Sequence, residues 1–271
     1  VVTWGNADWG GDSGRVAAQL SGGVQSVVGT QHAFAAVKAD GPLVTWGYAD
    51  GGGDSRRVAT QLSGGVQSVV GNVYAFAAVK VDGSVVTWGH AEYGGDSRRV
   101  AAQLSGGVQS VVRTQFAFAA VKVDGSVVTW GDADFGGDSS RVAAQLSGGV
   151  QSVVGNGRAF AAVKADGSAV TWGSAVDGGD SRPVAAQLSG GVQSVVGNGY
   201  AFAAVKVDGS VVTWGEAPWG GDSSGVAAQL SAGVQSVVGN HLTFAAMKVD
   251  GSVVTWGHAE YGGDSSRVAA Q

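Results

Sequence analysis

The chain repeats itself every 42 residues, and this period constrains its fold more than any other feature. The tryptophan of a Thr-Trp-Gly triplet recurs at Trp4, Trp46, Trp88, Trp130, Trp172, Trp214 and Trp256. Such a period indicates one small structural unit copied in space. Residues that recur in every copy therefore build the frame, whereas residues that differ between copies are free to carry function.

The 271 residues hold six full copies and 19 further residues. We therefore expect residues 1–271 to form a single repeat array rather than independent domains. Residues 1–19 and 253–271 are the same part of the repeat. A closed ring of seven units would need more residues than these, and a ring of six would leave 19 over, so a fragment of a longer array and an imperfectly closed ring are both open.

Composition excludes several classes of protein. The chain has no cysteine, so disulfides and thiolate metal sites are excluded. The formal net charge is −5, with 16 Lys and Arg mostly at repeated positions, which argues against a nucleic-acid partner. No apolar run approaches the roughly 18 to 20 residues of a membrane span. The sequence does not indicate a compartment.

Three segments of each copy read as β-strands. In the copy at residues 62–103 they are residues 66–70, 75–81 and 84–88, all short, rich in Val, Ala and aromatic residues, and bounded by Gly or Asn. Apolar side chains occur on both faces of these strands, as in residues 84–88. Both faces of each sheet are therefore expected to be covered, as when sheets pack against copies of themselves.

The second and third strands are joined by Asp82-Gly83, which predicts a hairpin with a two-residue type I′ turn. The same pair begins at Asp40, Asp124, Asp166, Asp208 and Asp250. The following stretch, residues 94–104, fits a short helix capped by Asp or Ser with apolar residues on one side. It fits an outer strand equally well, and Pro183 agrees with either.

These motifs resemble the RCC1-type repeat (regulator of chromosome condensation). The resemblance rests on V-x-x-V-x-x-G-x-x-x-x-x-A, followed by D-G-x-V-x-x-W-G and a Gly-rich loop, and on Gly29-Thr30-Gln31-His32 in the first copy. It implies an all-β fold, a β-propeller of six to seven RCC1-like blades. An open β-rich solenoid with a short helix per repeat is the alternative. The special loops and basic tail on which the founding member's activities depend are not found in this sequence.

Candidate chemical groups recur with the period. The Gly-Gly-Asp-Ser aspartates suit caps for backbone N–H groups better than calcium ligands, because the motif lacks a dense run of oxygen ligands. The strand-end lysines suit surface positions with a nearby Asp partner. We predict no metal and no cofactor. The aspartates are Asp12, Asp54, Asp96, Asp138, Asp180, Asp222 and Asp264, and the lysines are Lys38, Lys80, Lys122, Lys164, Lys206 and Lys248.

The positions that vary between copies are the candidate binding residues. One set follows each Trp-Gly in a loop expected on one rim, and it is acidic and aromatic: Asn6, Asp8, Trp9, Tyr48, Asp50, His90, Glu92, Tyr93, Asp132, Asp134, Phe135, Glu216, Trp219, His258, Glu260 and Tyr261. A second variable patch comprises Gln31-His32, Val73-Tyr74, Gln115-Phe116, Gly157-Arg158, Gly199-Tyr200 and His241-Leu242. Loops on a rigid scaffold carry recognition, and aromatic residues are frequent anchors. Drift among exposed loops, with aromatics lying on neighbouring blades, explains the pattern equally well.

An invariant frame with varied loops and no catalytic constellation predicts a non-enzymatic protein-binding scaffold or a structural subunit of a larger assembly. A lectin-like propeller that binds glycans is an alternative, because aromatic platforms beside carboxylates suit sugars. A designed or consensus-like protein without a natural ligand is another. An enzyme using a carboxylate pair such as Glu92 and Asp134 ranks last.

Overall fold

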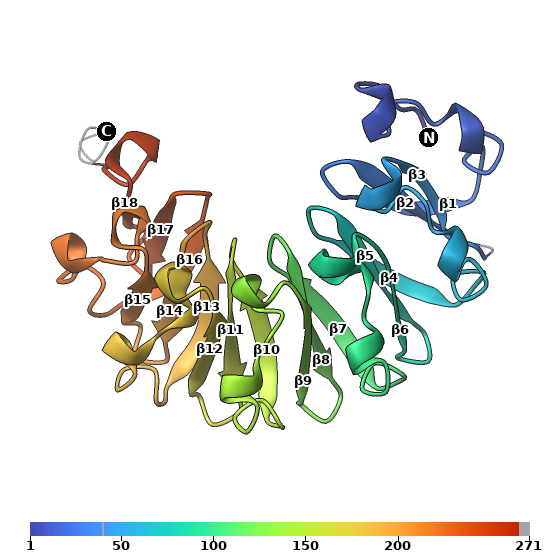
Figure 1. The fold of residues 1–271 in the computed structure, drawn as a ribbon. Helices are drawn as coiled ribbons and strands as arrows, with labels where there is room; N and C mark the ends of the chain where they lie inside the picture. Colours follow the sequence, from blue (N-terminus) through green and yellow to red (C-terminus); the bar gives the residue numbers. More distant parts are fainter. Residues whose placement is uncertain (40, 266–271) are drawn as a thin grey trace. The chain divides into compact units, whose positions relative to one another are not determined.

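The computed structural model describes residues 1–39 and 41–265. The chain divides into two compact units, Val1–Ala133 and Asp134–Gln271. Each unit contains three antiparallel sheets of three strands, and the strands of each sheet follow one another in chain order (Figure 1). Each sheet is thus made from one repeat.

The first unit contains strands β1 to β9. Their bounds are Val24–Gly29, Ala33–Lys38 and Val44–Gly47, then Val66–Gly71, Ala75–Lys80 and Val85–Gly89, then Val108–Arg113, Ala117–Lys122 and Val127–Gly131. The second unit contains β10 to β18, with bounds Val150–Gly155, Ala159–Lys164 and Ala169–Gly173, then Val192–Gly197, Ala201–Lys206 and Val211–Gly215, then Val234–Gly239, Thr243–Lys248 and Val253–Gly257.

The central strand of each internal sheet is buried on both faces, as the apolar pattern predicts. In β5, all residues from Ala75 to Val79 are buried. Alanines on this strand allow neighbouring sheets to approach, while Phe76 fills volume and stacks on Trp88, the partner opposite it in β6, at 5.1 Å between ring centroids. Burying one such aromatic side chain stabilises the fold by about 1.5–3 kcal/mol.

A tryptophan clamp joins consecutive repeats within each unit. The Trp88 Nε1–H donates to the carbonyl of Gly52 in the preceding repeat at 3.0 Å. The same bond recurs at Trp46, Trp130, Trp172, Trp214 and Trp256. Trp4 has no strand around it and is 84% exposed. The repeated tryptophan is therefore a frame residue in six of its seven positions.

The hairpin turn differs from the predicted type I′ turn, because no residue other than glycine has a positive φ among the described residues. Instead, the Gly83 N–H donates to the Lys80 carbonyl, and Lys80 donates to Ser84. Gly83 has a φ of +76°. This is a three-residue loop, in which an ordinary turn is followed by a left-handed glycine. Asp40 lies outside the described residues.

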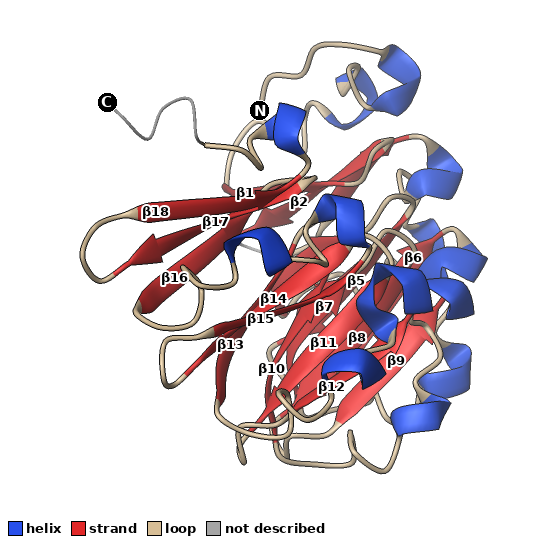
Figure 2. Ribbon diagram, turned by 90° about the vertical axis from the view of Figure 1, so that its left-hand side faces the viewer, coloured by secondary structure: helices blue, strands red, loops and turns tan. Residues whose placement is uncertain are grey.

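Residues 94–104, for which the sequence fits a short helix and an outer strand equally well, contain a short helical turn rather than a strand, and so do the equivalent residues of the other repeats that the structure describes in full. Each repeat has two such turns, drawn as separate helices beside the strands in Figure 2. Those after the Trp-Gly pair are η1, η3, η5, η7, η9, η11 and η13, at Ala7–Trp9, Ala49–Gly51, Ala91–Gly95, Ala133–Phe135, Ala175–Gly179, Ala217–Trp219 and Ala259–Tyr261. Those after Gly-Gly-Asp-Ser are η2, η4, η6, η8, η10 and η12, at Gly14–Val16, Arg56–Val58, Arg98–Val100, Ser140–Val142, Arg182–Val184 and Ser224–Val226.

Six three-stranded antiparallel sheets confirm the predicted all-β class, and among the described residues each full repeat forms one propeller-type blade. The short helical turns are present as well, but they accompany complete blades. In the part of the chain that the structure describes, no helix is both long and apolar enough to cross a membrane.

Candidate functional site: the aromatic and acidic rim

The two variable patches lie at the same end of each sheet. The hairpin register places Ala75 opposite Gly89, so the residues that precede β5 and follow β6 are neighbours. The His90 N–H then donates to the Tyr74 carbonyl at 3.0 Å. We call these paired loops, residues 72–74 and 90–93 and their equivalents in other repeats, the rim.

A buried asparagine ties the two rim loops together. The Asn72 side chain accepts hydrogen bonds from the N–H groups of Tyr74 and Ala75, at 3.0 and 2.7 Å, and donates to the Tyr93 carbonyl at 2.6 Å. Asn156, Asn198 and Asn240 make the equivalent donation, and Thr30 makes it with its hydroxyl. The backbone of the rim is therefore part of the frame, and the variation is confined to side chains.

Rim aromatics in the first unit stack from one repeat to the next. His32 lies parallel to Tyr74, with ring centroids 4.9 Å apart and an interplanar angle of 6°. Tyr74 stacks on Phe116 at 6.1 Å. The rings of the other rim loop join this row. The Trp9 ring lies perpendicular to the His32 ring, with centroids 4.8 Å apart, and Tyr93 lies 4.5 Å from Phe116. Each such contact contributes about 0.5–1.5 kcal/mol beyond area burial.

The second unit has rim contacts of the same kind but different composition. Trp219 stacks on His258 at 4.9 Å and lies 5.6 Å from Tyr200. The Arg158 guanidinium lies 5.2 Å from the centre of the Phe135 ring. At the aromatic position of another repeat stands Asp177, which is buried and accepts a hydrogen bond from the Ser174 hydroxyl at 2.5 Å. Each repeat therefore gives the rim a different surface on the same backbone.

The predicted site residues divide by exposure. Three aromatic residues face solvent, with Trp9 51%, Tyr48 45% and Tyr261 58% exposed. The half-exposed members are His90, Tyr93, Asp132, Phe135, Glu216, Trp219 and His258. The acidic residues at the second position of the helical turns are exposed, as is Asn6, which caps the first of these turns: Asp8, Asp50, Glu92, Asp134 and Glu260.

Histidines contribute to the rim by stacking. Nδ1 of His32, His90 and His258 is buried and has no hydrogen-bond partner among the described residues. His90 lies 4.4 Å from Tyr93, with an interplanar angle of 21°. An imidazole whose nitrogen is enclosed in this way offers its ring face, rather than that nitrogen, to a neighbour.

The repeated charged residues have local structural roles. The Asp54 carboxylate accepts a hydrogen bond from the Arg56 N–H and pairs with the Arg56 guanidinium. The side-chain hydrogen bond from Arg56 is the largest cause of the lowered pKa of Asp54, which is about 2. Asp96 and Asp180 are held in the same way by Arg98 and Arg182, whose guanidinium groups are their ion-pair partners. No group of His, Asp and Glu within residues 1–39 and 41–265 could hold a metal ion.

The strand-end lysines lie near the turn aspartates and also hydrogen-bond to a main-chain carbonyl. Hydrogen bonds from Ser84 are the largest cause that lowers the pKa of Asp82, and the charge of Lys80 adds to them. Nζ of Lys80 donates to the main-chain carbonyl of Gln61 at 2.7 Å. Lys38, Lys122, Lys206 and Lys248 donate to the equivalent glutamine carbonyls. These cations tether the connection between repeats.

Sequence reasoning treated the second variable patch separately and left its residues out of the site. The structure brings these residues into the rim: His32, Tyr74, Phe116, Arg158, Tyr200 and His241. The hairpin register was the available signal, because two strands joined by a tight turn have their free ends side by side.

Comparison with known proteins gives likeness to solved structures alone. No family model and no curated protein match the chain. Prp20p from Saccharomyces cerevisiae aligns at 13% identity over 86% of this chain and 71% of its own, with a TM-score of 0.49. The CRINKLY WD40 ectodomain of the Arabidopsis thaliana receptor kinase ACR4 aligns at 17% identity over 87% and 81%, with a TM-score of 0.47. The computationally designed protein Ika8 aligns at 13% over 86% and 70%, with a TM-score of 0.41. These values transfer no function to this chain.

Proposed function

We propose that the chain is a non-catalytic, RCC1-like scaffold that binds a protein partner through its rim. The observation that supports this most is the division between a repeated hydrogen-bond frame and varied rim side chains. Asn72 and its equivalents hold the loops at main-chain atoms, so side chains change from repeat to repeat without altering the backbone. A rigid backbone with varied side chains is the usual arrangement of recognition loops.

The composition of the rim suits a protein surface. Exposed carboxylates surround aromatic rings that are partly covered and already held in place. Such rings lose little side-chain entropy on binding, and acidic residues around them steer a basic partner. The partner expected on these grounds has a basic surface with apolar or aromatic side chains near its centre.

A protein partner is favoured over a glycan by the stacking. Sugars bind to free aromatic faces, yet the faces of His32, Tyr74 and Trp219 are directed at neighbouring rings. Trp9, Tyr48 and Tyr261 are the most exposed rim aromatics, and they belong to separate repeats.

Charge neutralisation tests the proposal without disturbing the stack. One variant changes four exposed rim acids to amides: Asp8→Asn, Asp50→Asn, Glu92→Gln and Glu260→Gln. Its matched control makes the same charge change at four hairpin turns: Asp82→Asn, Asp124→Asn, Asp166→Asn and Asp208→Asn. Each protein is immobilised at equal density and exposed to extract from the source cells. We expect the rim variant to lose the partner that the wild type and control retain. Equal retention on all three would refute rim binding.

A further inference from the structure

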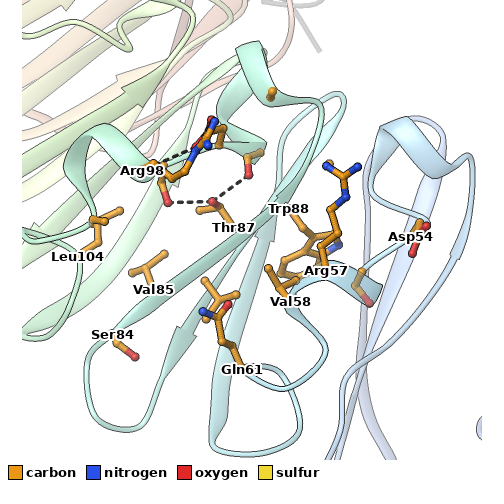
Figure 3. A pocket seen from close by; sticks show the side chains of 18 of the residues that line it. Asp54, Arg57, Val58, Gln61, Ser84, Val85, Thr87, Trp88, Arg98 and Leu104 are labelled. Atoms are coloured by element: carbon orange, nitrogen blue, oxygen red, sulfur yellow. Dashed lines mark hydrogen bonds and ion pairs between the residues drawn. The ribbon is translucent and has the colours of Figure 1, made fainter.

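The outer edge of the sheet β4-β5-β6 carries a groove that the rim does not use. Its volume is about 890 Å³, and its floor is the edge strand, residues 84–89 (Figure 3). One wall is formed by Arg57, Val58 and Gln61 from the preceding repeat. Leu104 lies on the opposite side of the groove, as Figure 3 shows. Ala101 also lines the groove. Volumes of this size are typical of ligand sites.

Some main-chain N–H and C=O groups of the edge strand β6 face this groove without a hydrogen-bond partner among the described residues. Lys80 donates to Ser84 and His90 donates to Tyr74, so the even-numbered residues of β6 bond to β5 and the odd-numbered ones face outward. The outward Val85 N–H is taken by the Leu104 carbonyl at 2.9 Å. Within the described part of the chain, no hydrogen bond uses the Thr87 N–H, the Thr87 carbonyl or the Val85 carbonyl.

Thr87 is only 8% exposed, so its main-chain groups are largely withdrawn from bulk solvent. The Thr87 hydroxyl lies within hydrogen-bond distance of the Gly95 carbonyl and of the Ser97 hydroxyl, which fixes the side chain to one side of the strand. A buried main-chain N–H without a partner costs free energy that an added acceptor would recover. Two acceptors and one donor in a row fit the backbone of an extended chain.

The groove recurs at an equivalent position of the second unit. There, a groove of about 430 Å³ follows Ser210, Val211 and Val212, and the Val211 N–H donates to the Leu230 carbonyl as its counterpart does. The position of Arg57 is occupied by Pro183, and that of Arg98 by Ser224. The main-chain pattern is thus common to the repeats, while the charge along the groove differs.

Charge around the first groove favours an acidic occupant. Its lining includes three cationic and three acidic side chains. Asp54 and Asp96 are neutralised by ion pairs with Arg56 and Arg98. Arg57, Lys80 and Asp50 line the groove and form no ion pair with the described residues. The lining side chains outside ion pairs therefore carry two positive charges and one negative charge.

We propose that this groove binds an extended peptide segment with an acidic side chain, which adds to β6 as a fourth strand. A peptide residue opposite Thr87 would donate to its carbonyl and accept from its N–H, and a second peptide N–H would donate to the Val85 carbonyl. The acidic side chain would reach Arg57 on the wall (Figure 3). This is strand addition at a sheet edge, with backbone bonds for affinity and one charge for selectivity.

Threonine-selective ¹⁵N NMR of the full chain tests the proposal. The chain has eleven threonines, and each signal is assigned by a Thr→Val substitution. The probe is the acetylated, amidated pentapeptide Thr-Val-Glu-Val-Thr. Its matched control is the same peptide with methylated central nitrogens, which cannot pair with a strand. We expect the Thr87 amide signal to shift downfield with the probe and to stay in place with the control. We expect the amide signal of Thr213, in the repeat where Pro183 stands at the position of Arg57, to shift less.

Arg57→Gln should weaken the Thr87 response about two- to fivefold, as expected for a partly exposed ion pair. Arg141→Gln, at the same position of another repeat, should leave the Thr87 response unchanged. The proposal is overturned if Thr87 does not respond at millimolar probe, or if both peptides shift it equally. It is also overturned if the rim threonine Thr30 responds in place of Thr87. Because the readout is local, these outcomes are independent of whether the rim binds a protein.

Discussion

Two glycines of the same chain show what decides whether a side chain is tolerated at one position. Gly94 has a φ of +98°, and a Cβ there would lie 2.6 Å from the Phe118 ring. Gly64 has an ordinary φ and nothing within 4 Å of such a Cβ. Gly94→Ala should therefore destabilise the protein by about 1–3 kcal/mol, whereas Gly64→Ala should be neutral or slightly stabilising. Urea unfolding of both variants measures this, and equal midpoints would contradict the packing described.

Three exposed arginine–aspartate pairs are expected to contribute to the stability of the fold in acid. The side-chain hydrogen bond from arginine is the largest cause that lowers the pKa of Asp54, Asp96 and Asp180, each to about 2. A carboxyl whose pKa is lowered by folding stabilises the native state above its unfolded pKa, and that contribution is lost as the pH falls through the folded value. The window is therefore about pH 4 to about pH 2.

Replacing the three arginines tests whether these ion pairs contribute to stability in acid. In the variant with Arg56→Ala, Arg98→Ala and Arg182→Ala, the free energy of unfolding should fall less steeply between about pH 4 and about pH 2 than in the wild type. The backbone hydrogen bonds to the aspartates remain, so the dependence should be reduced rather than abolished. Chemical denaturation at several pH values measures the slope, and identical slopes would show that the pairs do not contribute.

At the scale of elements, the rim loops depend on the asparagine between them. Asn72 is 3% exposed, and Asn72→Ala removes three hydrogen bonds and leaves buried main-chain groups without partners. A cost of about 1–3 kcal/mol follows, with a change in the near-ultraviolet circular dichroism of the stacked rings. Asn240 is exposed, and its bond to the Tyr261 carbonyl is 3.4 Å long. Asn240→Ala is therefore the matched control, and a comparable loss there would contradict the role given to burial.

Element positions were predictable because the repeat makes each strand visible several times. The predicted segments 66–70, 75–81 and 84–88 differ from β4, β5 and β6 by a residue or two at their ends. The turn type was not predictable from Asp82-Gly83 alone. The Asp82 carboxylate accepts hydrogen bonds from the N–H and hydroxyl of Ser84, and these contacts accompany the longer loop. The Asp-Gly pair used for the prediction does not include Ser84.

The two rim loops were predictable from the sequence, but the contact that joins them was not. Variation between copies identified both loops, but the bond that joins them links Asn72 to a carbonyl 21 residues away. Spacing along the chain does not reveal such a contact. The choice between helix and strand after Gly-Gly-Asp-Ser was open for the same reason, since the Val85 N–H is satisfied by the Leu104 carbonyl from a turn, rather than by another strand.

On the scale of the whole molecule, the same backbone serves two purposes. Tryptophan clamps and buried alanine-rich strands make the repeats alike, and the rim makes them different. The account's central claim is that this difference is used for binding, so that a partner contacts the rim rather than the opposite ends of the hairpins. Val81 and Val123 mark those hairpin ends and are 74% and 75% exposed, which makes them accessible control positions.

Site-specific photo-crosslinking in extract from the source cells tests that claim most directly. A photoreactive amino acid is placed singly at Asp50 or Glu92 on the rim, and at Val81 or Val123 on the hairpin ends. The account predicts a discrete crosslinked partner from both rim positions and none of the same mass from the hairpin positions. Crosslinks of equal yield from all four positions, or from the hairpin ends alone, would contradict it.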